Sequence, residues 1–401
     1  MAVRTPLKPK ARNSKLVAAL LSWFAANARD LPWRRTHDPY AIWVSEIMLQ
    51  QTQVKTVIPF WERWMRELPT IEAVANAPSA KIHKLWEGLG YYTRVRNLQK
   101  AAQQIGKSGM RNAECGKAAY EFPRNYEDIL ALPGIGRYTA GAICSIAFNQ
   151  PTPILDGNVI RVLTRLFGIG ENPKEKATNA RLWQLAEDLV KEANICRWGE
   201  HPRVREPDGG RAQAPARGDA RPTNCSHLNQ SLMELGALVC TPRQAQCLIC
   251  PINKLCIAFK KNRVEELPNL GKRETATTRH FLAFAIECGG KFLVQQRPAG
   301  VVNAHLWEFP NAEITGTKAD ANTAFRKLFG VKPKAIQPLR TVKHSITRYR
   351  ITLEAFAVLL AKPPARANGH WLAPAEFDAL AFSSAHKKLA SAAAKSILSD
   401  R

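Results

Sequence analysis

The sequence has few acidic residues and no long apolar run, and both shortages narrow what the chain can do. Only 33 aspartates and glutamates stand against 58 lysines and arginines, so the formal net charge is +25. A folded chain with this excess usually meets a polyanion, and nucleic acid is the first candidate. No apolar stretch is long enough to span a membrane, and the N-terminus lacks the apolar segment of a signal peptide. We therefore expect a cytoplasmic protein with a nucleic-acid partner and no membrane partner.

Evidence for disulfides is lacking too, and strand patterns are scarce in much of the chain. The nine cysteines are an odd number and come without a secretion signal, which argues against a disulfide framework. Strand-like alternation is scarce before residue 275, whereas helical periodicity is frequent there. At 401 residues the chain can hold two or three domains. We therefore expect an all-α region up to about residue 260 and a domain of another class after it.

Apolar residues at helical spacing predict a series of helices in this first region. Residues 1–12 are basic and contain proline, which favours a disordered arm, and residues 40–65 form one long helix or two helices joined near Gln51. Residues 197–224 are rich in arginine, proline and glycine, so we expect a disordered insertion there. The other expected helices span residues 14–28, 70–77, 79–88, 91–105, 125–131, 139–148, 157–167, 178–192 and 227–239.

The pattern changes after a linker at residues 261–278. Strand-like runs bounded by glycine, proline or charge occur beyond it, together with two helical patterns. These features predict a separate α+β domain at residues 279–401. The expected strands span 280–286, 291–295 and 349–358, and the expected helices span 319–329 and 384–398.

A turn rich in glycine and proline occupies residues 132–137, between two expected helices. Pro133 ends the first helix, while Gly134 and Gly136 allow positive φ and leave backbone amides uncovered before a helix restarts near Thr139. Uncovered amides at a helix start form a natural phosphate site. By itself the turn is weak evidence, since most such turns only connect helices.

Two acidic residues have neighbours that suggest chemistry. Asp156 lies beside Gly157 at the start of an expected helix, shortly after the turn. Glu46 has Ile42 and Trp43 one turn back on the same side of its helix. A carboxylate against an apolar stripe has a raised pKa, which suits a general acid near neutral pH. Taken alone, however, an exposed or capping glutamate is the more common case.

Four cysteines form a compact pattern typical of a metal centre. Cys240, Cys247, Cys250 and Cys256 are separated by six, two and five residues. Four soft thiolate ligands suit zinc or an iron–sulfur cluster. Zinc ribbons more often pair two close cysteine doublets, and only one such doublet occurs here. The other five cysteines show no ligand pattern.

Several motifs are similar to those of the adenine DNA glycosylases, the MutY family of the helix-hairpin-helix base-excision glycosylases. The cysteine spacing is that of the branch that carries a 4Fe–4S cluster. The resemblance covers roughly residues 15–258 and implies a helical glycosylase domain at 13–260, with a six-helix part at about 38–150 and a cluster-bearing part at 13–37 and 151–260. The motifs are Leu31-Pro32-Trp33, Glu46-Ile47-Met48-Leu49-Gln50-Gln51-Thr52, Gly88-Leu89-Gly90-Tyr91-Tyr92, the turn at 132–137, Asp156 and the four cysteines.

The resemblance gives roles to both acids. Adenine leaves poorly unless its ring is protonated, so Glu46 would protonate N7 and Asp156 would stabilise the oxocarbenium-like sugar. Neither acid can reach a stacked base, so the adenine must be flipped out of the duplex. The substrate is then double-stranded DNA with adenine opposite 8-oxoguanine or guanine, and we expect a monomer associated with the nucleoid.

Further residues receive roles from the same resemblance. Arg34 and Gln230 would contact adenine or Glu46, and Asn158 would support Asp156. Tyr91 would act as an aromatic wedge that replaces lost stacking, although a core tyrosine is a serious alternative. The remaining assignments are Gln50, Gln51 and Thr52 for the substrate, the gap and the opposite base, and Gly134, Gly136 and Arg137 for the DNA backbone.

Position 138 separates monofunctional from bifunctional relatives. The endonuclease III branch has a lysine there, whose amine can form a Schiff base with the sugar and cut the strand. Tyr138 can hydrogen-bond Glu46 but cannot do that chemistry, so we expect a monofunctional glycosylase. An endonuclease III-like enzyme for damaged pyrimidines is disfavoured by Tyr138 and by the C-terminal domain. An inactive, cluster-bearing DNA-binding module is disfavoured by the presence of both acids.

The domain at 279–401 resembles the MutT-like, or Nudix-like, domain of adenine glycosylases. The matching pieces are Gln295-Gln296-Arg297-Pro298 and Leu306-Trp307-Glu308-Phe309-Pro310. The acids of a nucleotide hydrolase are missing after Pro310, so no Mg²⁺ site is expected. In the family this domain reads 8-oxoguanine through a Phe-Ser-His loop. Ile346, Thr347 and Arg348 stand there in this chain, and Thr347 keeps the hydroxyl expected to contact the opposite base.

Overall fold

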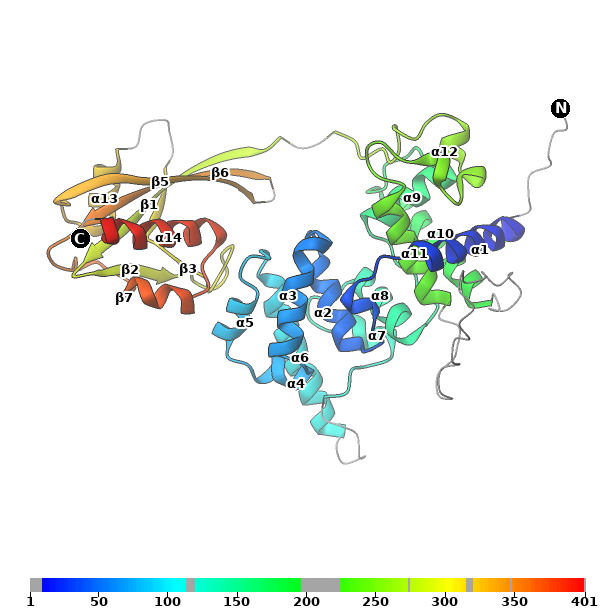
Figure 1. Cartoon of the computed structure of the whole chain (residues 1–401), viewed down its shortest axis with the longest axis horizontal. Coiled ribbons are helices and arrows are strands. Elements are labelled where there is room, and N and C mark those ends of the chain that lie inside the picture. Colours follow the sequence, from blue (N-terminus) through cyan, green and yellow to red (C-terminus); the bar gives the residue numbers. More distant parts are fainter. Residues whose placement is uncertain are drawn as a thin grey trace, which may run out of the picture. The chain divides into compact units, whose positions relative to one another are not determined.

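The computed structural model describes residues 9–112, 120–195, 224–272, 275–314, 320–346 and 348–399. The chain divides into two compact units, each of which combines two separate stretches of sequence (Figure 1). The first unit contains residues 1–51 and 104–272, and the second contains residues 52–103 and 273–401. The expected insertion at 197–224 lies almost wholly outside the described residues, because α11 begins at Asn224.

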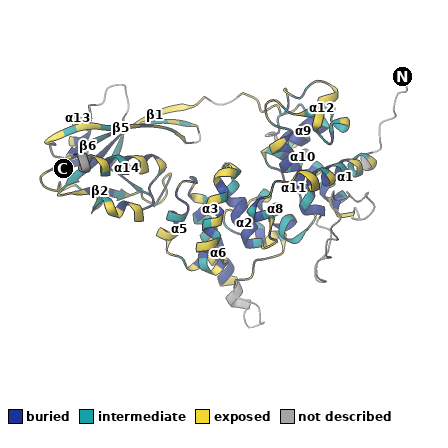
Figure 2. Ribbon diagram, in the orientation of Figure 1, coloured by how far each residue is buried: buried dark blue, intermediate teal, exposed yellow. Residues whose placement is uncertain are grey.

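The first unit is helical, as the sequence predicts. Its elements pack around one apolar core built mainly from α1, α9, α10 and α11, and Figure 2 shows their buried faces. The elements are α1 (Pro9–Asn27), η1 (Pro32–Arg34), α2 (Pro39–Leu49), α7 (Tyr126–Leu130), α8 (Arg137–Phe148), α9 (Gly157–Phe167), α10 (Lys176–Ile195), α11 (Asn224–Leu238), η3 (Cys247–Ile249), η4 (Asn253–Leu255) and α12 (Ile257–Lys260).

Helix starts in this unit follow from local chemistry. Asp38 caps α2 by accepting hydrogen bonds from the Tyr40 and Ala41 amides, and Pro39 occupies the first helical position. The helix α1 begins at Pro9, so the last residues of the expected disordered arm are helical. Arg12 explains this extension, since its guanidinium donates to the carbonyls of Leu166 and Leu255.

The described part of the second unit contains six α-helices, of which α6 continues into the first unit, and a mixed sheet. The sheet order is β3-β2-β1-β6-β5, with β4 paired to β1, β7 paired to β2, and β1 parallel to β6. Separate apolar clusters cover the two faces, one with α14 and the other with α13. The elements are α3 (Val54–Glu67), α4 (Ile71–Asn76), α5 (Ser79–Leu85), α6 (Thr93–Asn112, which continues into the first unit), β1 (Thr277–Cys288), β2 (Lys291–Gln296), β3 (Trp307–Glu308), β4 (Asn311–Ile314), α13 (Ala321–Phe329), β5 (Ala335–Ile346), β6 (Tyr349–Leu359), β7 (His370–Leu372), η5 (Pro374–Ala379) and α14 (Ser384–Ser399).

The structure decides one alternative that the sequence left open and shows a strand that the sequence did not predict. Residues 40–65 form two helices, since Gln51 adopts a φ of 56° that ends α2. At the position of the family's Phe-Ser-His loop, Ile346 still belongs to strand β5, and β6 begins at Tyr349. The predicted base-reading residue Thr347 lies outside the described residues. Within the described part of the chain, every helix is too short or too polar to cross a lipid bilayer.

Candidate active site

Glu46 and Tyr138 meet between α2 and α8 in the first unit. The Tyr138 hydroxyl donates a hydrogen bond of 2.8 Å to Glu46 Oε2, and Glu46 is only 5% exposed. Burial raises the pKa of Glu46 to about 7, although the hydrogen bond from Tyr138 opposes the shift. Burial also raises the pKa of Tyr138, so its hydroxyl keeps the proton that it donates. Glu46 can therefore carry a transferable proton near neutral pH.

Asp156 is the N-cap of α9, which fixes both of its carboxylate oxygens. Oδ1 accepts from the Val159 amide at 2.7 Å, and Oδ2 accepts from Asn158 Nδ2 at 2.9 Å. Burial raises the pKa of Asp156, and these hydrogen bonds oppose that shift by favouring the ionised form. The Asp156 charge acts on Glu46 and contributes to its raised pKa, so the two carboxyl groups belong to one electrostatic site.

Arg161 orients the side chain of Asn158, a role that the sequence analysis did not predict. Its Nη2 donates to Asn158 Oδ1 at 2.7 Å and to the Gly236 carbonyl at 2.8 Å. Its Nε donates to the Cys240 carbonyl at 2.7 Å. Arg161 is 9% exposed, so a buried cation joins the support of Asp156 to the start of the cysteine loop. Its position one turn after Asn158 on α9 was the available signal.

Gly236 allows α11 to approach Asn158 closely. A Cβ placed on Gly236 would lie 2.6 Å from Asn158 Cβ and 3.1 Å from its carbonyl oxygen, which is backbone that cannot swing away. Gly236→Ala is therefore expected to displace Asn158 and, with it, Asp156. Because small misplacements at a reacting centre are costly, excision should fall by about tenfold or more. Single-turnover excision measures the effect.

Gly170→Ala is the matched control for Gly236→Ala, since its added Cβ would meet only the end of the Arg263 side chain at 3.4 Å. It should leave excision close to that of the unchanged protein. Equal rates for the two alanine variants would show that α11 has room to shift without moving Asn158.

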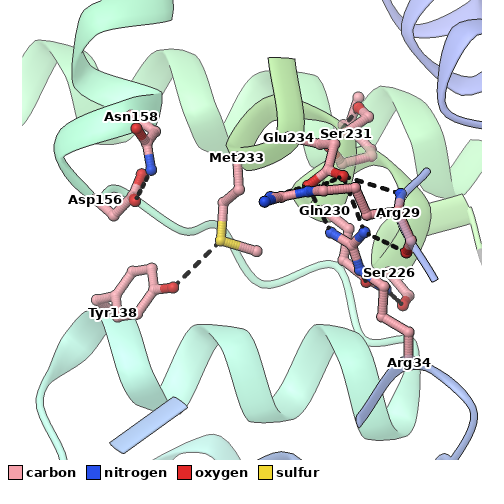
Figure 3. Close-up of polar contacts among 11 residues, drawn as sticks. Arg29, Arg34, Tyr138, Asp156, Asn158, Ser226, Gln230, Ser231, Met233 and Glu234 are labelled. Atoms are coloured by element: carbon pink, nitrogen blue, oxygen red, sulfur yellow. Dashed lines mark hydrogen bonds and ion pairs between the residues drawn. The ribbon is translucent and has the colours of Figure 1, made fainter. Parts of the chain in front are cut away.

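Arg34 and Gln230, which the resemblance assigns to contacts with adenine or Glu46, are bonded to each other, and Arg34 is also bonded to Glu234, which the sequence analysis did not name. Arg34 Nε donates to Gln230 Oε1 at 2.9 Å, and Nη2 donates to Glu234 Oε2 at 3.0 Å. Arg29 binds the same Glu234 carboxylate (Figure 3). Burial alone would raise the pKa of Glu234, but the two arginines lower it to about 2. An acid inside the apolar run of α11 was the signal for this buried ion cluster.

Met233 of α11 lies between Tyr138 and this ion cluster (Figure 3). The Tyr138 hydroxyl lies 3.2 Å from Met233 Sδ. Gln230 uses its other amide atom on Ser226 Oγ at 3.0 Å. The hydrogen bonds of the Gln230 side chain therefore go to Ser226 and Arg34, and its expected contact with adenine stays a prediction.

The turn before α8 leaves its backbone open. Gly134 has a φ of 79°, as expected, but Gly136 has a φ of −101° and does not need glycine for its backbone conformation. A Cβ on Gly136 would meet nothing within 4 Å, so the small residue keeps the first amides of α8 uncovered. The Arg137 guanidinium stacks 3.9 Å from the centre of the Trp183 ring. The open amides suit a phosphate, and the expected contact of this turn with the DNA backbone stays a prediction.

The residues assigned to the gap and the opposite base fall in both units. Gln50 donates to Thr139 Oγ1 at 3.5 Å in the first unit. In the second unit, Thr52 Oγ1 lies 3.5 Å from Arg94 Nη2. Tyr91 is 42% exposed and has a φ of 48°, a conformation rare for a bulky residue. An exposed, backbone-strained aromatic suits a wedge better than a core position, but its role stays a prediction.

The four cysteines line one cavity, together with Arg165 and residues of the surrounding loop. Arg165 Nη1 lies 3.4 Å from Cys240 Sγ, so a cation accompanies the sulfurs. Three or more potential ligands arranged for a single metal ion are not found among the described residues. Four thiolates around one cavity suit a cationic metal–sulfur core, and the Arg165 guanidinium can offset the negative charge of the ligating sulfurs.

Both parts of the chain are similar to known protein families. The HhH-GPD superfamily of base excision DNA repair proteins matches residues 44–188, and the NUDIX domain matches residues 282–392. The adenine DNA glycosylase of Homo sapiens is 33% identical over 92% of this chain and 72% of its own length. The chain belongs to the adenine DNA glycosylase family. That of Buchnera aphidicola subsp. Schizaphis graminum is 30% identical over 84% of this glycosylase and 81% of its own length.

A solved structure of a thermostable thymine-DNA glycosylase is also similar. It aligns with a TM-score of 0.48 and 28% identity, covering 63% of this glycosylase and 98% of that chain. The family relatives confirm three expectations from the sequence: the fold class, the family and an adenine-specific DNA N-glycosylase of base excision repair. The glycosylase therefore binds DNA and cleaves N-glycosyl bonds.

Proposed function

We propose that the glycosylase is monofunctional and removes adenine paired with 8-oxoguanine or guanine. The observation that carries the proposal is the Glu46–Tyr138 pair, a buried acid with a pKa of about 7 that is held by a hydroxyl and not by an amine. The flipped adenine receives a proton from Glu46 at N7, the glycosidic bond breaks, and water adds to the sugar. Asp156 stabilises the positive charge that develops on the sugar.

A panel of mispaired duplexes tests this proposal in single-turnover reactions. Adenine opposite 8-oxoguanine or guanine should release free adenine, and the strand should break only after treatment with alkali. Borohydride should trap almost no enzyme–DNA adduct, since Tyr138 offers no amine for a Schiff base. Release of damaged pyrimidines with a high yield of trapped adduct would instead favour an endonuclease III-like activity.

We propose further that Cys240, Cys247, Cys250 and Cys256 hold a 4Fe–4S cluster. Their shared cavity and the nearby Arg165 support this assignment. The cluster would be structural, because it would fix the loop at 240–256, to which Arg161 is anchored through the Cys240 carbonyl.

Protein purified without oxygen is expected to absorb in the visible region and to contain iron and sulfide, as iron–sulfur clusters do. Cys250→Ser should lower the iron content, because it removes one ligand. Cys288→Ser is the matched control, since Cys288 lies on β1 outside the cavity. Zinc in stoichiometric amount without iron would refute the cluster.

We propose that residues 279–401 read the base opposite the adenine, with Thr347 as the main contact. An 8-oxoguanine differs from guanine by a C8 carbonyl and an N7–H donor, and a hydroxyl can accept from that N–H. One good contact of this kind provides about 1–3 kcal/mol of discrimination. Arg348 would bind a phosphate, which adds affinity without base selectivity.

Removal of this domain is expected to reduce the preference for 8-oxoguanine over guanine. The measurement is the ratio of adenine excision from the two duplexes, for the full chain and for a chain ending near Arg273. Thr347→Val should reproduce part of the loss, whereas Thr323→Val on α13 should not. An unchanged ratio after truncation would leave base selectivity to Thr52 and Tyr91. The monomeric state and the nucleoid location stay predictions.

A further inference from the structure

Glu87 is a buried acid two residues after the end of α5 and has no part in the proposed chemistry. Its side chain is 5% exposed. Oε1 accepts a hydrogen bond of 3.0 Å from the Phe382 amide, and Oε2 accepts from Lys387 Nζ at 2.6 Å. Lys84 Nζ donates to the same Oε2 at 2.9 Å. Two of the three partners therefore come from the Nudix-like part of the second unit, nearly three hundred residues further along the chain.

These partners keep Glu87 ionised. Burial alone would raise the pKa of Glu87, but hydrogen bonds from Lys387, Lys84 and the Phe382 amide lower it below the usual range. A buried carboxylate that loses one of its cations is strongly penalised. The ion cluster thus requires Lys387 of α14 to stay beside the end of α5.

Neighbouring contacts join the same two parts of the second unit. Lys84 Nζ also donates to the Leu380 carbonyl at 2.9 Å. On the other side of Glu87, Arg96 Nη1 donates to the Ala304 carbonyl at 3.0 Å. The rings of His83 and His305 stack with their centres 6.2 Å apart. The Nudix-like part therefore contacts the chain both before residues 86–92, at His83 and Lys84, and after them, at Arg96.

Residues 86–92, called the Tyr91 loop below, have little freedom of their own. Trp86 Nε1 donates to the Gly90 carbonyl at 3.0 Å, and Arg94 Nη2 donates to the Leu89 carbonyl at 2.9 Å. Gly88 has a φ of 114°, which other residues rarely adopt. A displacement of Glu87 is thus transmitted to the exposed ring of Tyr91, four residues along a tightly bonded loop.

We infer that Glu87 is a positioning residue that couples the Nudix-like domain to the Tyr91 loop, so that engagement of the opposite base by the domain sets the position of the Tyr91 ring in the DNA. The inference rests on the proposed reading of the opposite base by residues 279–401. The physical link is the ion cluster of Glu87 with Lys84 of α5 and Lys387 of α14. A movement of either the domain or the loop would disturb this cluster.

The test is the ratio of single-turnover excision from adenine opposite 8-oxoguanine to that from adenine opposite guanine, measured on the full chain. Glu87→Gln keeps the shape but loses the charge, and Lys387→Met removes one cation. Each should reduce the ratio by about threefold or more, and the double variant should do no worse than the stronger single variant, because both changes break one interaction. A merely structural role would slow excision on both duplexes equally and leave the ratio unchanged.

Glu67→Gln is the matched control, since Glu67 is an exposed acid that pairs with Lys81 at 3.6 Å away from the Nudix-like part. It should not alter the ratio. Hydrogen exchange at residues 86–92, expected to quicken in Glu87→Gln, gives a second readout if excision is too slow to measure. An unchanged ratio and unchanged exchange in Glu87→Gln overturn the inference. Thr347→Val then shows whether the proposed base reading fails too, since a reduced ratio there leaves that proposal standing.

Discussion

Glu46→Gln is expected to lower single-turnover adenine excision by about 10²-fold or more, the usual contribution of a general acid. The amide keeps the size of the side chain and can still accept the hydrogen bond from Tyr138. It has no acidic proton for the departing adenine. Binding to the mispaired duplex should stay close to normal, because the missing proton is needed only as the bond breaks.

The pH profile separates this role from a structural one. With a pKa of about 7, Glu46 loses its proton on the alkaline side of neutrality, so excision should fall as the pH rises through 7. In Glu46→Gln the residual rate should lack that decline. Glu62→Gln, which changes an exposed glutamate of α3, should keep both the rate and the profile. A Glu46→Gln rate close to normal would remove Glu46 from the role of acid.

At alkaline pH, the Glu46→Gln substitution should change stability in the opposite direction to activity. The pKa of Glu46 is higher in the folded chain than its ordinary value of 4.5, so the folded state binds the proton more tightly. The free energy of unfolding therefore falls as the pH rises from about 4.5 to 7 and stays reduced above that range. At alkaline pH, Glu46→Gln should melt at a higher temperature than the unchanged protein. A less active but more stable variant cannot owe its defect to unfolding.

Asp156→Asn is expected to reduce excision by a similar factor, about 10²-fold or more, because the developing sugar cation loses its counter-charge. An asparagine oxygen can still cap α9 through the Val159 amide, so the helix should remain. The hydrogen bond from Asn158 would be lost, since an amide nitrogen cannot accept from Asn158 Nδ2 as Asp156 Oδ2 does.

The chain contains a matched control for the capping role. Asp320 caps α13 in the same way, by accepting from the Asn322 and Thr323 amides. Asp320→Asn makes the same chemical change at a helix start far from the chemistry in sequence, and excision should be unaffected. If both asparagine variants excise adenine at the normal rate, Asp156 is a cap and nothing more.

The helices were predictable because their signals are local. Helix α9 spans the expected residues 157–167, and the raised pKa of Glu46 follows from the apolar side chains around it. Strand β5 was missed because most of its residues are exposed and Pro338 interrupts the pattern. A strand held by pairing with β6 over most of its length needs no apolar alternation of its own.

The residues that support the site could not be predicted from the sequence, for a different reason. Arg161, Glu234 and Gly236 acquire their roles from partners that lie far away in sequence. Glu234 on α11 meets arginines from the first turn after α1, and nothing in the residues around Glu234 names that partner. Reactive groups carry a chemical signature, whereas the residues that orient them are defined only by the folded chain.

The interleaved order of the two units has a consequence for synthesis. Residues 52–103 group with residues 273–401, so the smaller part of the second unit leaves the ribosome well before the larger part. Until α14 emerges, Glu87 has neither Phe382 nor Lys387 as a partner. A chain terminated early after residue 272 would carry Glu46 and Asp156 but lack the larger part of the second unit. A premature stop codon there is thus expected to lower the amount of protein in the cell as well as its base selectivity.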